Sequence, residues 1–207
     1  LPESLKPGES RSAGQFHFKR LGRAFTRRGV RLVLLTMFVT TFAFAQFEST
    51  LSLLTAEMSL SDKDNFYIFA YVGFVLALSQ GMLIRRLATR IDAKSLALFG
   101  TVVMVVGLAL IGVAGENKSL TQLLWVVPIA VVGFSATTPA LQSLLSLKTP
   151  ADQQGEVLGI GQSISALARI LGPVAGMRLF SETQLALPYW AGAGLMAVGA
   201  ILVSLLT

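Results

Sequence analysis

The sequence contains no cysteine, one histidine and few charged side chains, and each shortage removes a class of function. Without cysteine, the chain forms no disulfide, thiolate metal site or cysteine nucleophile. The histidine, His17, lies outside every long apolar run, which excludes a histidine-based proton relay inside a membrane. The apolar runs also lack a pair of aspartates. We therefore predict no enzyme, and no catalytic residue, metal or cofactor.

The composition points instead to a membrane. Only 14% of the 207 residues are charged, against about a quarter in a typical soluble domain. Hydrophobic residues make up 53% of the chain, and the mean hydropathy is +0.67. Each of six runs has the roughly 20 residues that a helix needs to cross a bilayer. We predict an all-α membrane protein with a six-helix transmembrane bundle, whose spans are about 31–56, 65–84, 95–115, 119–147, 156–178 and 185–207.

Residues 1–30 form a basic segment ahead of the first span, and we interpret them as a cytoplasmic linker. The positions up to Arg31 hold the whole net charge of +6. The aromatic and basic stretch 16–28 fits an interfacial segment on an anionic leaflet and, equally, a solvated linker that only sets topology. Nucleic-acid binding is not expected. Because the chain starts at Leu1 with polar residues, we expect it to be a piece of a longer chain cut within a linker.

The distribution of basic residues orients the predicted spans. The second loop carries four basic residues against Asp92, and it lies on the same side as the N-terminal segment. By the positive-inside rule, that side and both termini are cytoplasmic. We expect a multi-pass protein of a plasma or bacterial inner membrane.

The fifth span, 156–178, is the least ordinary of the six. Small residues at four-residue spacing form a flat stripe that lets another helix approach closely. We assign this stripe, together with Pro173, to packing between helix bundles. Its members are Gly155, Gly159, Ser163, Gly172 and Gly176.

Two charged residues lie inside the spans, and we predict that they lie close enough to pair, directly or through water. Glu48 lies in the first span and Arg169 in the fifth. Both spans start on the same side of the membrane, and the helix rise places the two residues at a similar depth. An unpaired charge at that depth is costly. The pair could be a proton-coupling switch or a static clamp between two helices, and both interpretations remain open.

The fourth span contains Pro128 and Pro139 and a cluster of small and polar residues, so we predict a broken helix that lines a cavity. A merely kinked packing helix is the alternative. The side chains that we expect to face a substrate cavity are Gln46, Phe134, Thr138, Gln142 and Gln162.

These features resemble the C-terminal half of a major facilitator superfamily transporter, and within it the drug:proton antiporters that include tetracycline-efflux-like proteins. The resemblance covers residues 31–207 and rests mainly on QFESTLSLL, YVGFVLALSQG and SALARILGP. The second loop is similar to the superfamily's cytoplasmic loop motif, although Arg85 replaces its aspartate and Ala88 its second glycine. The matching positions are Gly81, Leu83, Arg86 and Arg90.

The resemblance implies twelve spans in two six-helix bundles, with substrate bound at mid-membrane between them. The first and fourth spans would then line the cavity, and the second and fifth would pack against the missing N-terminal half. The implied function is proton-coupled export of a small amphipathic molecule by alternating access. Two alternatives remain: a non-transporting receptor or scaffold of transporter ancestry, and a substrate:cation symporter of the same superfamily.

Overall fold

A computed structural model describes residues 27–181 and 184–206, and every element named within them is helical. Six helices are long and apolar enough to cross a membrane, which confirms the predicted fold class. The helices are α2 (Arg28–Glu57), α3 (Asp62–Leu78), the π-helical η1 (Ser79–Ile84), α4 (Arg85–Leu87), α5 (Ala93–Glu116), α6 (Leu120–Leu147), the 3-10 turn η2 (Ala151–Gln153), α7 (Gln154–Leu179) and α8 (Leu187–Ser204).

Two helices start three residues before their predicted spans. Helix α2 begins at Arg28, so the last residues assigned to the linker are helical. The rest of that linker, with its interfacial alternative, lies outside the described residues. Helix α3 begins at Asp62, three residues early, because the Ser61 hydroxyl accepts from the Asp64 N–H while the Asp64 carboxylate accepts from the Ser61 N–H. This capping box fixes the start of the helix.

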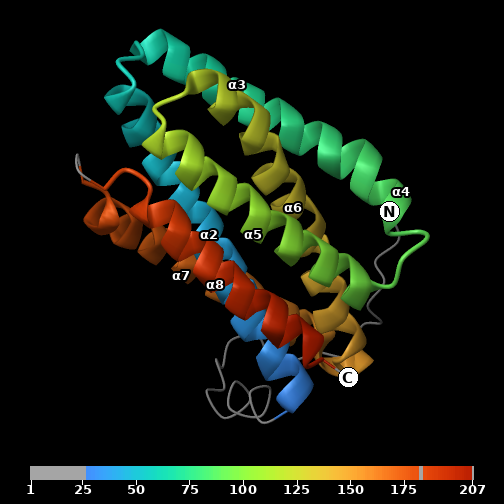
Figure 1. Cartoon of the computed structure of the whole chain (residues 1–207). Helices are drawn as coiled ribbons and strands as arrows, with labels where there is room; N and C mark the ends of the chain where they lie inside the picture. The colour runs from blue at the N-terminus through green and yellow to red at the C-terminus, as the bar shows by residue number, and fades with distance from the viewer. Residues whose placement is uncertain (1–26, 182–183, 207) are drawn as a thin grey trace, which may run out of the picture.

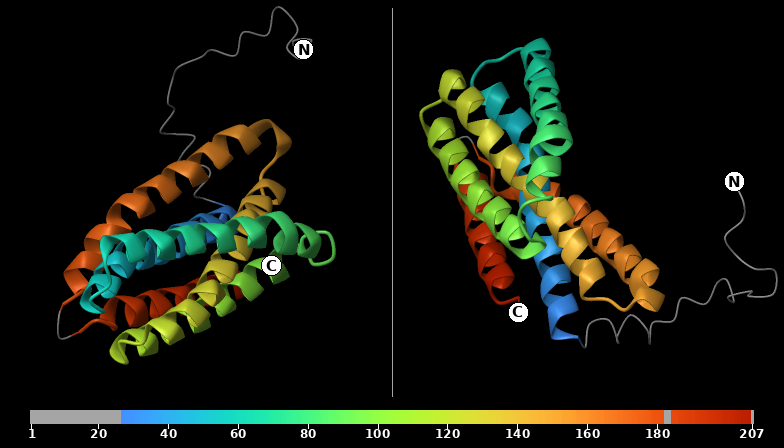
Figure 2. Two further views of the ribbon diagram at one scale, coloured as in Figure 1. Left: turned by 90° about the horizontal axis from the view of Figure 1, so that it is seen from above. Right: turned by 90° about the vertical axis from the view of Figure 1, so that its right-hand side faces the viewer.

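Helix α2 occupies the middle of the bundle. It packs against α7, α8 and α6, while α5 packs against α6 and α8 on the other side. Figure 1 shows α3 along one edge, and the view from above in Figure 2 places α7 and α5 on opposite sides. Of the most apolar stretch of each helix, 67% is buried in α2 but only 22% in the α3 span and 28% in the α7 span. These two helices therefore present their apolar surface outward.

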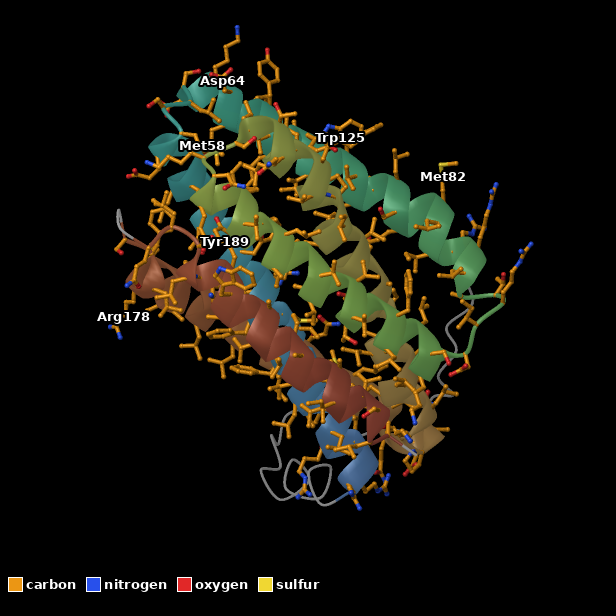
Figure 3. All side chains as sticks on the ribbon, in the orientation of Figure 1. Met58, Asp64, Met82, Trp125, Arg178 and Tyr189 are labelled. Atoms are coloured by element: carbon orange, nitrogen blue, oxygen red, sulfur yellow. The ribbon has the colours of Figure 1, made fainter. Side chains whose placement is uncertain are left out.

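The core consists of two apolar clusters with a polar layer between them. One cluster lies toward the α2–α3 loop and includes Phe47, Leu51 and Tyr189; the other, toward the start of α2, includes Leu34 and Leu145. Figure 3 shows Tyr189 within the bundle and Trp125, which is 78% exposed, on its outside. The buried hydroxyl residues of the layer between the clusters are Thr40, Thr41, Thr101, Ser135 and Thr137.

The contact between α5 and α6 depends on glycine. A Cβ added at Gly133 would lie 2.6 Å from the Met104 nitrogen and 2.7 Å from the Gly100 carbonyl oxygen. An added Cβ at Gly107 would overlap the backbone of Ala130. The two backbones therefore touch directly, as in other close helix contacts in membranes.

Helix α6 is continuous from Leu120 to Leu147, so the predicted break at Pro128 and Pro139 is wrong. A proline removes the hydrogen bond to the carbonyl four residues earlier. For Pro128 that carbonyl belongs to Leu124, and it accepts a hydrogen bond from the Tyr71 hydroxyl of α3 at 3.1 Å. A neighbouring helix thus replaces the missing donor, and the helix continues.

Candidate functional site

A pocket of about 300 Å³ opens between α2, α6 and α7. It lies near the middle of α2 and α7, at the level of the polar layer. Four of the five predicted cavity residues, Phe134, Thr138, Gln142 and Gln162, come together here with Arg169. The remaining lining residues are Met37, Thr40, Thr41, Ser165 and Ala166.

One wall of this pocket is apolar and rigid. The Phe134 ring stacks on the Phe44 ring of α2, with centroids 3.7 Å apart and planes 7° from parallel. Phe134 is itself buried, so it joins the pocket to the core rather than standing free within it. Met37 and Ala166 extend the apolar surface.

The polar lining residues differ in how their hydrogen-bonding groups are used. Thr40 and Thr138 donate to carbonyls of their own helices, Met37 at 3.2 Å and Phe134 at 3.1 Å. Across the part of the chain that the structure describes, no hydrogen bond engages the remaining five side chains, which come from three helices. These are Thr41, Gln142, Gln162, Ser165 and Arg169. The pocket therefore gathers unused donors and acceptors.

Arg169 is the only charged side chain in the lining. A direct ion pair between Arg169 and Glu48 is not formed: the ion pair recorded among the described residues joins Lys118 to Glu57, at 4.0 Å. Glu48 follows Thr41 by two turns, about 10 Å of helix rise. Since Thr41 and Arg169 line the same pocket, Glu48 lies farther along α2 on the same stripe, and it is exposed. The two residues do not lie at a similar level, because Gly172 contacts Phe42 and Gly176 contacts Gln46, which aligns Arg169 with Thr41 rather than with Glu48.

Gln46, the fifth predicted cavity residue, is not in the pocket. It lies about 140° around α2 from Thr41 and is 1% exposed. Its Nε2 donates to the Pro188 carbonyl of α8 at 2.6 Å, and its Oε1 has no hydrogen-bond partner among the described residues. Gln46 therefore joins α2 to α8 inside the bundle, and its assignment to the cavity is wrong.

The small-residue stripe of α7 divides into two faces. Gly172 and Gly176 are buried, and an added Cβ there would lie 2.7 Å from the Phe42 carbonyl oxygen and 2.8 Å from Gln46 Cγ, respectively. These glycines pack within the bundle, on α2, so their assignment to an inter-bundle contact is wrong; Pro173 beside them is half-buried. Gly155 and Gly159 meet nothing within 4 Å, and Ser163 is exposed.

The division follows from helical geometry. Ser163 and Gly172 are nine residues apart, which is about two and a half turns, so they point to opposite sides of the helix. The same exposed side continues beyond Ser163 with large apolar residues, among them Ile170, 66% exposed, and Met177, 54% exposed. We call this surface, from Gly155 to Met177, the open face of α7.

The predicted loop motif is partly helical. Gly81 and Leu83 lie in the π-helical segment η1, and Arg86 lies in α4; only Arg90 lies in the turn that follows. All four side chains or positions are exposed. No proline interrupts the segment, and the helix continues through it in π-helical form. The motif therefore begins inside the span, before the loop.

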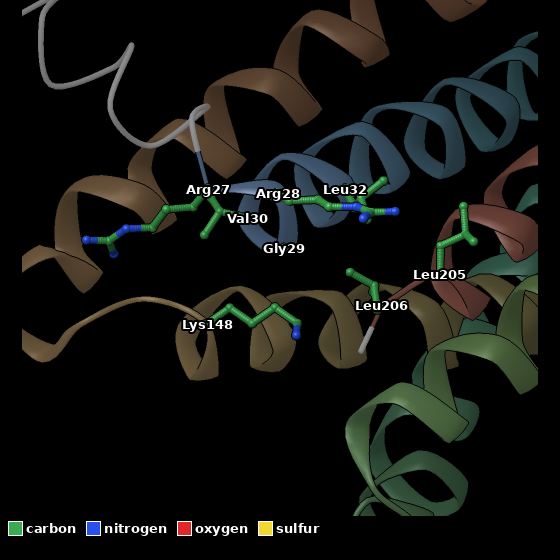
Figure 4. Close-up of a pocket in the computed structure, with 8 residues that line it drawn as sticks. All are labelled: Arg27, Arg28, Gly29, Val30, Leu32, Lys148, Leu205 and Leu206. Carbon is green, nitrogen blue, oxygen red and sulfur yellow. The ribbon is translucent and has the colours of Figure 1, made fainter.

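A second pocket, of about 280 Å³, lies at the end of the bundle where α2 begins. Figure 4 shows Arg27, Arg28 and Lys148 around it, with Leu205 and Leu206 from the end of the chain. The Lys148 side chain passes across Gly29, where an added Cβ would lie 2.9 Å from its Cδ. None of the site residues predicted from the sequence lines this basic pocket, because its members come from the start of α2, the end of α6 and the end of α8.

Within residues 27–181 and 184–206, no group of three or more histidine or acidic side chains is arranged to hold a metal ion.

A sequence model of the Major Facilitator Superfamily matches residues 2–173 and, in a second match, residues 81–207. The chain belongs to the Major Facilitator Superfamily. With its six helices of spanning length, it is an integral membrane protein. The family membership also supports a transport function.

Three relatives within the superfamily illustrate its range. Major facilitator superfamily domain-containing protein 10 of Mus musculus is 28% identical over 154 residues, which are 74% of this chain and 33% of the relative. Tetracycline resistance protein, class B, of Escherichia coli is 25% identical over 126 residues, 61% of this chain and 30% of the relative. Solute carrier family 22 member 18 of Rattus norvegicus is 25% identical over 186 residues, which are 87% of this chain and 44% of the relative. The chain thus spans between 30% and 44% of the length of these relatives.

Proposed function

We propose that this chain is the C-terminal six-helix half of a secondary transporter that exports a small amphipathic molecule by alternating access, with protons as the coupling ion. The observation that carries the proposal is the pocket between α2, α6 and α7. It combines an apolar wall with five unused polar side chains, at the depth where a substrate would be held between two bundles.

The N-terminal half is the proposed partner, and it would cover two exposed apolar surfaces. One is the open face of α7. The other lies on α3, where Phe66 is 69% exposed and Phe74 is 62% exposed, and where Gly73 meets nothing within 4 Å. The spans that contain α3 and α7 are less buried than the other four. A second bundle seated on α3 and α7 would enclose the pocket between them.

For the coupling ion, Glu48 is the candidate group. It lies in the interior of a span, is exposed, and continues the stripe of α2 that carries Met37 and Thr41 in the pocket. A carboxylate in this place can bind and release a proton as the access to the pocket alternates. The end of the bundle that bears Arg28, Arg86 and Lys148 would be cytoplasmic, in keeping with the positive-inside rule.

The test is uptake into proteoliposomes that contain the complete natural protein, with and without a pH gradient. We expect Gln142→Ala to reduce uptake at least tenfold. Gln122→Ala, the same change on the same helix but at an exposed site near its start, should leave uptake unchanged. Equal rates in both variants would contradict the assignment of the pocket.

Glu48→Gln tests the coupling separately. We expect it to remove the dependence of uptake on the pH gradient, whereas Glu57→Gln, at the end of the same helix, should keep it. Unchanged dependence on the gradient in Glu48→Gln would assign Glu48 a structural role. Binding without any uptake in the wild type would favour a receptor or scaffold.

A further inference from the structure

Arg169 has chemistry that the bundle itself does not satisfy. Its guanidinium is charged at every physiological pH and offers five donors in a planar fork. It lies in the pocket, near the middle of the span-length helix α7, and charged side chains in the interior of a membrane span are costly and normally have a partner. No carboxylate lines the pocket, and no ion pair among the described residues includes Arg169.

The other acidic residues of the described chain are too far along their helices to serve. Glu48 lies two turns beyond the pocket, and it is the one acid in the interior of a described span. The remaining acids within the long helices are at their ends, for example Glu57, Glu116 and Glu156. Among the described residues, no acidic side chain is therefore placed in the pocket to pair with Arg169, which is exposed there.

We infer that the transported molecule carries a carboxylate, or an acid of similar geometry, which the Arg169 guanidinium binds in the pocket between α2, α6 and α7. This inference rests on the proposed function. A carboxylate matches the fork of a guanidinium with two parallel hydrogen bonds, an arrangement stronger than a neutral hydrogen bond. It would also neutralise the single positive charge of the pocket.

The other lining residues indicate which further groups the transported molecule carries. Ser165 and Thr41 offer hydroxyl groups, and Gln142 and Gln162 offer amides that can donate and accept. The Phe134 ring and Met37 supply an apolar wall opposite this polar set. The pocket thus fits an amphipathic acid with an apolar body and one or two further polar groups. Its volume of about 300 Å³ suits a small organic molecule.

The rival partner is an acidic side chain from the proposed N-terminal half. In that case Arg169 would be a structural group, and an acidic substrate would gain nothing over a neutral one. The two cases predict opposite outcomes for a pair of ligands that have nearly the same shape but differ in charge.

The experiment uses the complete natural protein, purified in detergent, and a panel of aryl and alkyl carboxylates, each matched with its primary amide. The dissociation constant of each ligand is measured. We expect at least one acid to bind tenfold or more tightly than its amide. Arg169→Gln should remove this preference, and Arg169→Lys, which keeps the charge but loses the fork, should retain part of it. Arg178→Gln, a matched change at the exposed end of the same helix, should retain all of it.

Amides that bind as tightly as acids, an acid preference that survives Arg169→Gln, or a panel in which no acid binds would each overturn the inference. Loss of the empty protein's thermal stability in Arg169→Gln, with equal binding of acids and amides, would identify the rival ion pair. The outcomes also separate the two proposals. Uptake of neutral molecules alone would keep the proposed function and remove the acid, whereas acids that bind without uptake would do the reverse.

Discussion

Two sets of glycines in this bundle have opposite surroundings. Gly107 and Gly133 lie where the backbones of α5 and α6 meet, and Gly172 lies where α7 meets α2. Gly155 and Gly159, on the same α7 helix, meet nothing within 4 Å. Glycine spacing alone therefore does not say which surface a helix uses. The buried set holds the bundle together, and the open set marks the surfaces that we assign to a second bundle.

The largest expected effect is at Gly133. In Gly133→Val, the new Cβ would lie 2.6 Å from the Met104 nitrogen, which is backbone and cannot rotate away. We expect a destabilisation of at least about 3 kcal/mol, the upper part of the usual range for overpacking, measured by thermal unfolding in detergent. Gly159→Val makes the same change in open space and should shift stability by less than about 0.5 kcal/mol. Equal effects at both sites would contradict the α5–α6 contact.

The next comparison lies within the α7–α2 contact. An added methyl group at Gly172 lies 2.7 Å from the Phe42 carbonyl oxygen, whereas at Gly176 the two nearest atoms belong to the side chains of Gln46 and Thr50 and the nearest backbone atom is 3.1 Å away. Side chains can shift more easily than backbone. Gly172→Ala should therefore destabilise the bundle by about 2 kcal/mol and Gly176→Ala by about 1 kcal/mol, in the same unfolding assay. The reverse order would place the closest approach of the helices nearer to Gly176.

Substitution of the open set should separate stability from transport. We expect the double variant Gly155→Leu, Gly159→Leu to leave the unfolding temperature of this chain unchanged. In the complete natural protein it should reduce uptake about tenfold, equivalent to ~1.4 kcal/mol, because the added side chains keep the second bundle at a distance. Full uptake in this variant would mean that the face contacts lipid. Gly194→Leu, at an open glycine of α8, is the matched control.

The smallest expected effect is at Tyr71. Tyr71→Phe removes the hydrogen bond to the Leu124 carbonyl, and bonds of this kind between membrane helices contribute about 0.6 kcal/mol. In a Pro128→Ala background, residue 128 donates to that carbonyl itself, so Tyr71→Phe should then cost almost nothing. A double-mutant cycle measures this coupling. A cycle without coupling would contradict the role of Tyr71, and Tyr67→Phe, at an exposed tyrosine, serves as control.

Most of the fold could be predicted from the sequence, because a bilayer leaves few solutions for a long apolar run. The six spans follow from length and composition alone. The sequence also made it possible to predict that Thr138, Gln142 and Gln162 lie near Arg169, since polar side chains in apolar helices turn away from lipid. The predictions that were wrong concerned which side of a helix a residue occupies. Gln46 and Gly172 were assigned to the right helices and the wrong faces.

Other features required the neighbouring helix to be known. Nothing near Pro128 in the sequence indicates that a tyrosine some 57 residues earlier supplies the missing donor. The depth of Glu48 relative to Arg169 likewise depends on where each helix starts and how the two helices align. Those alignments are set by the contacts of Gly172 and Gly176 with α2, which sequence spacing does not contain.

The π-helical segment Ser79–Ile84 has a consequence for the orientation of the α3 surface. Such a segment holds one residue more than the α-helical turn that it replaces. It therefore changes the phase of the helix by roughly 100°, the angle between successive residues. The insertion determines where Arg85 and Arg86 point relative to Phe66 and Phe74. The π-helical segment therefore fixes the angle about the helix axis between the exposed apolar side of α3 and the basic end of the molecule.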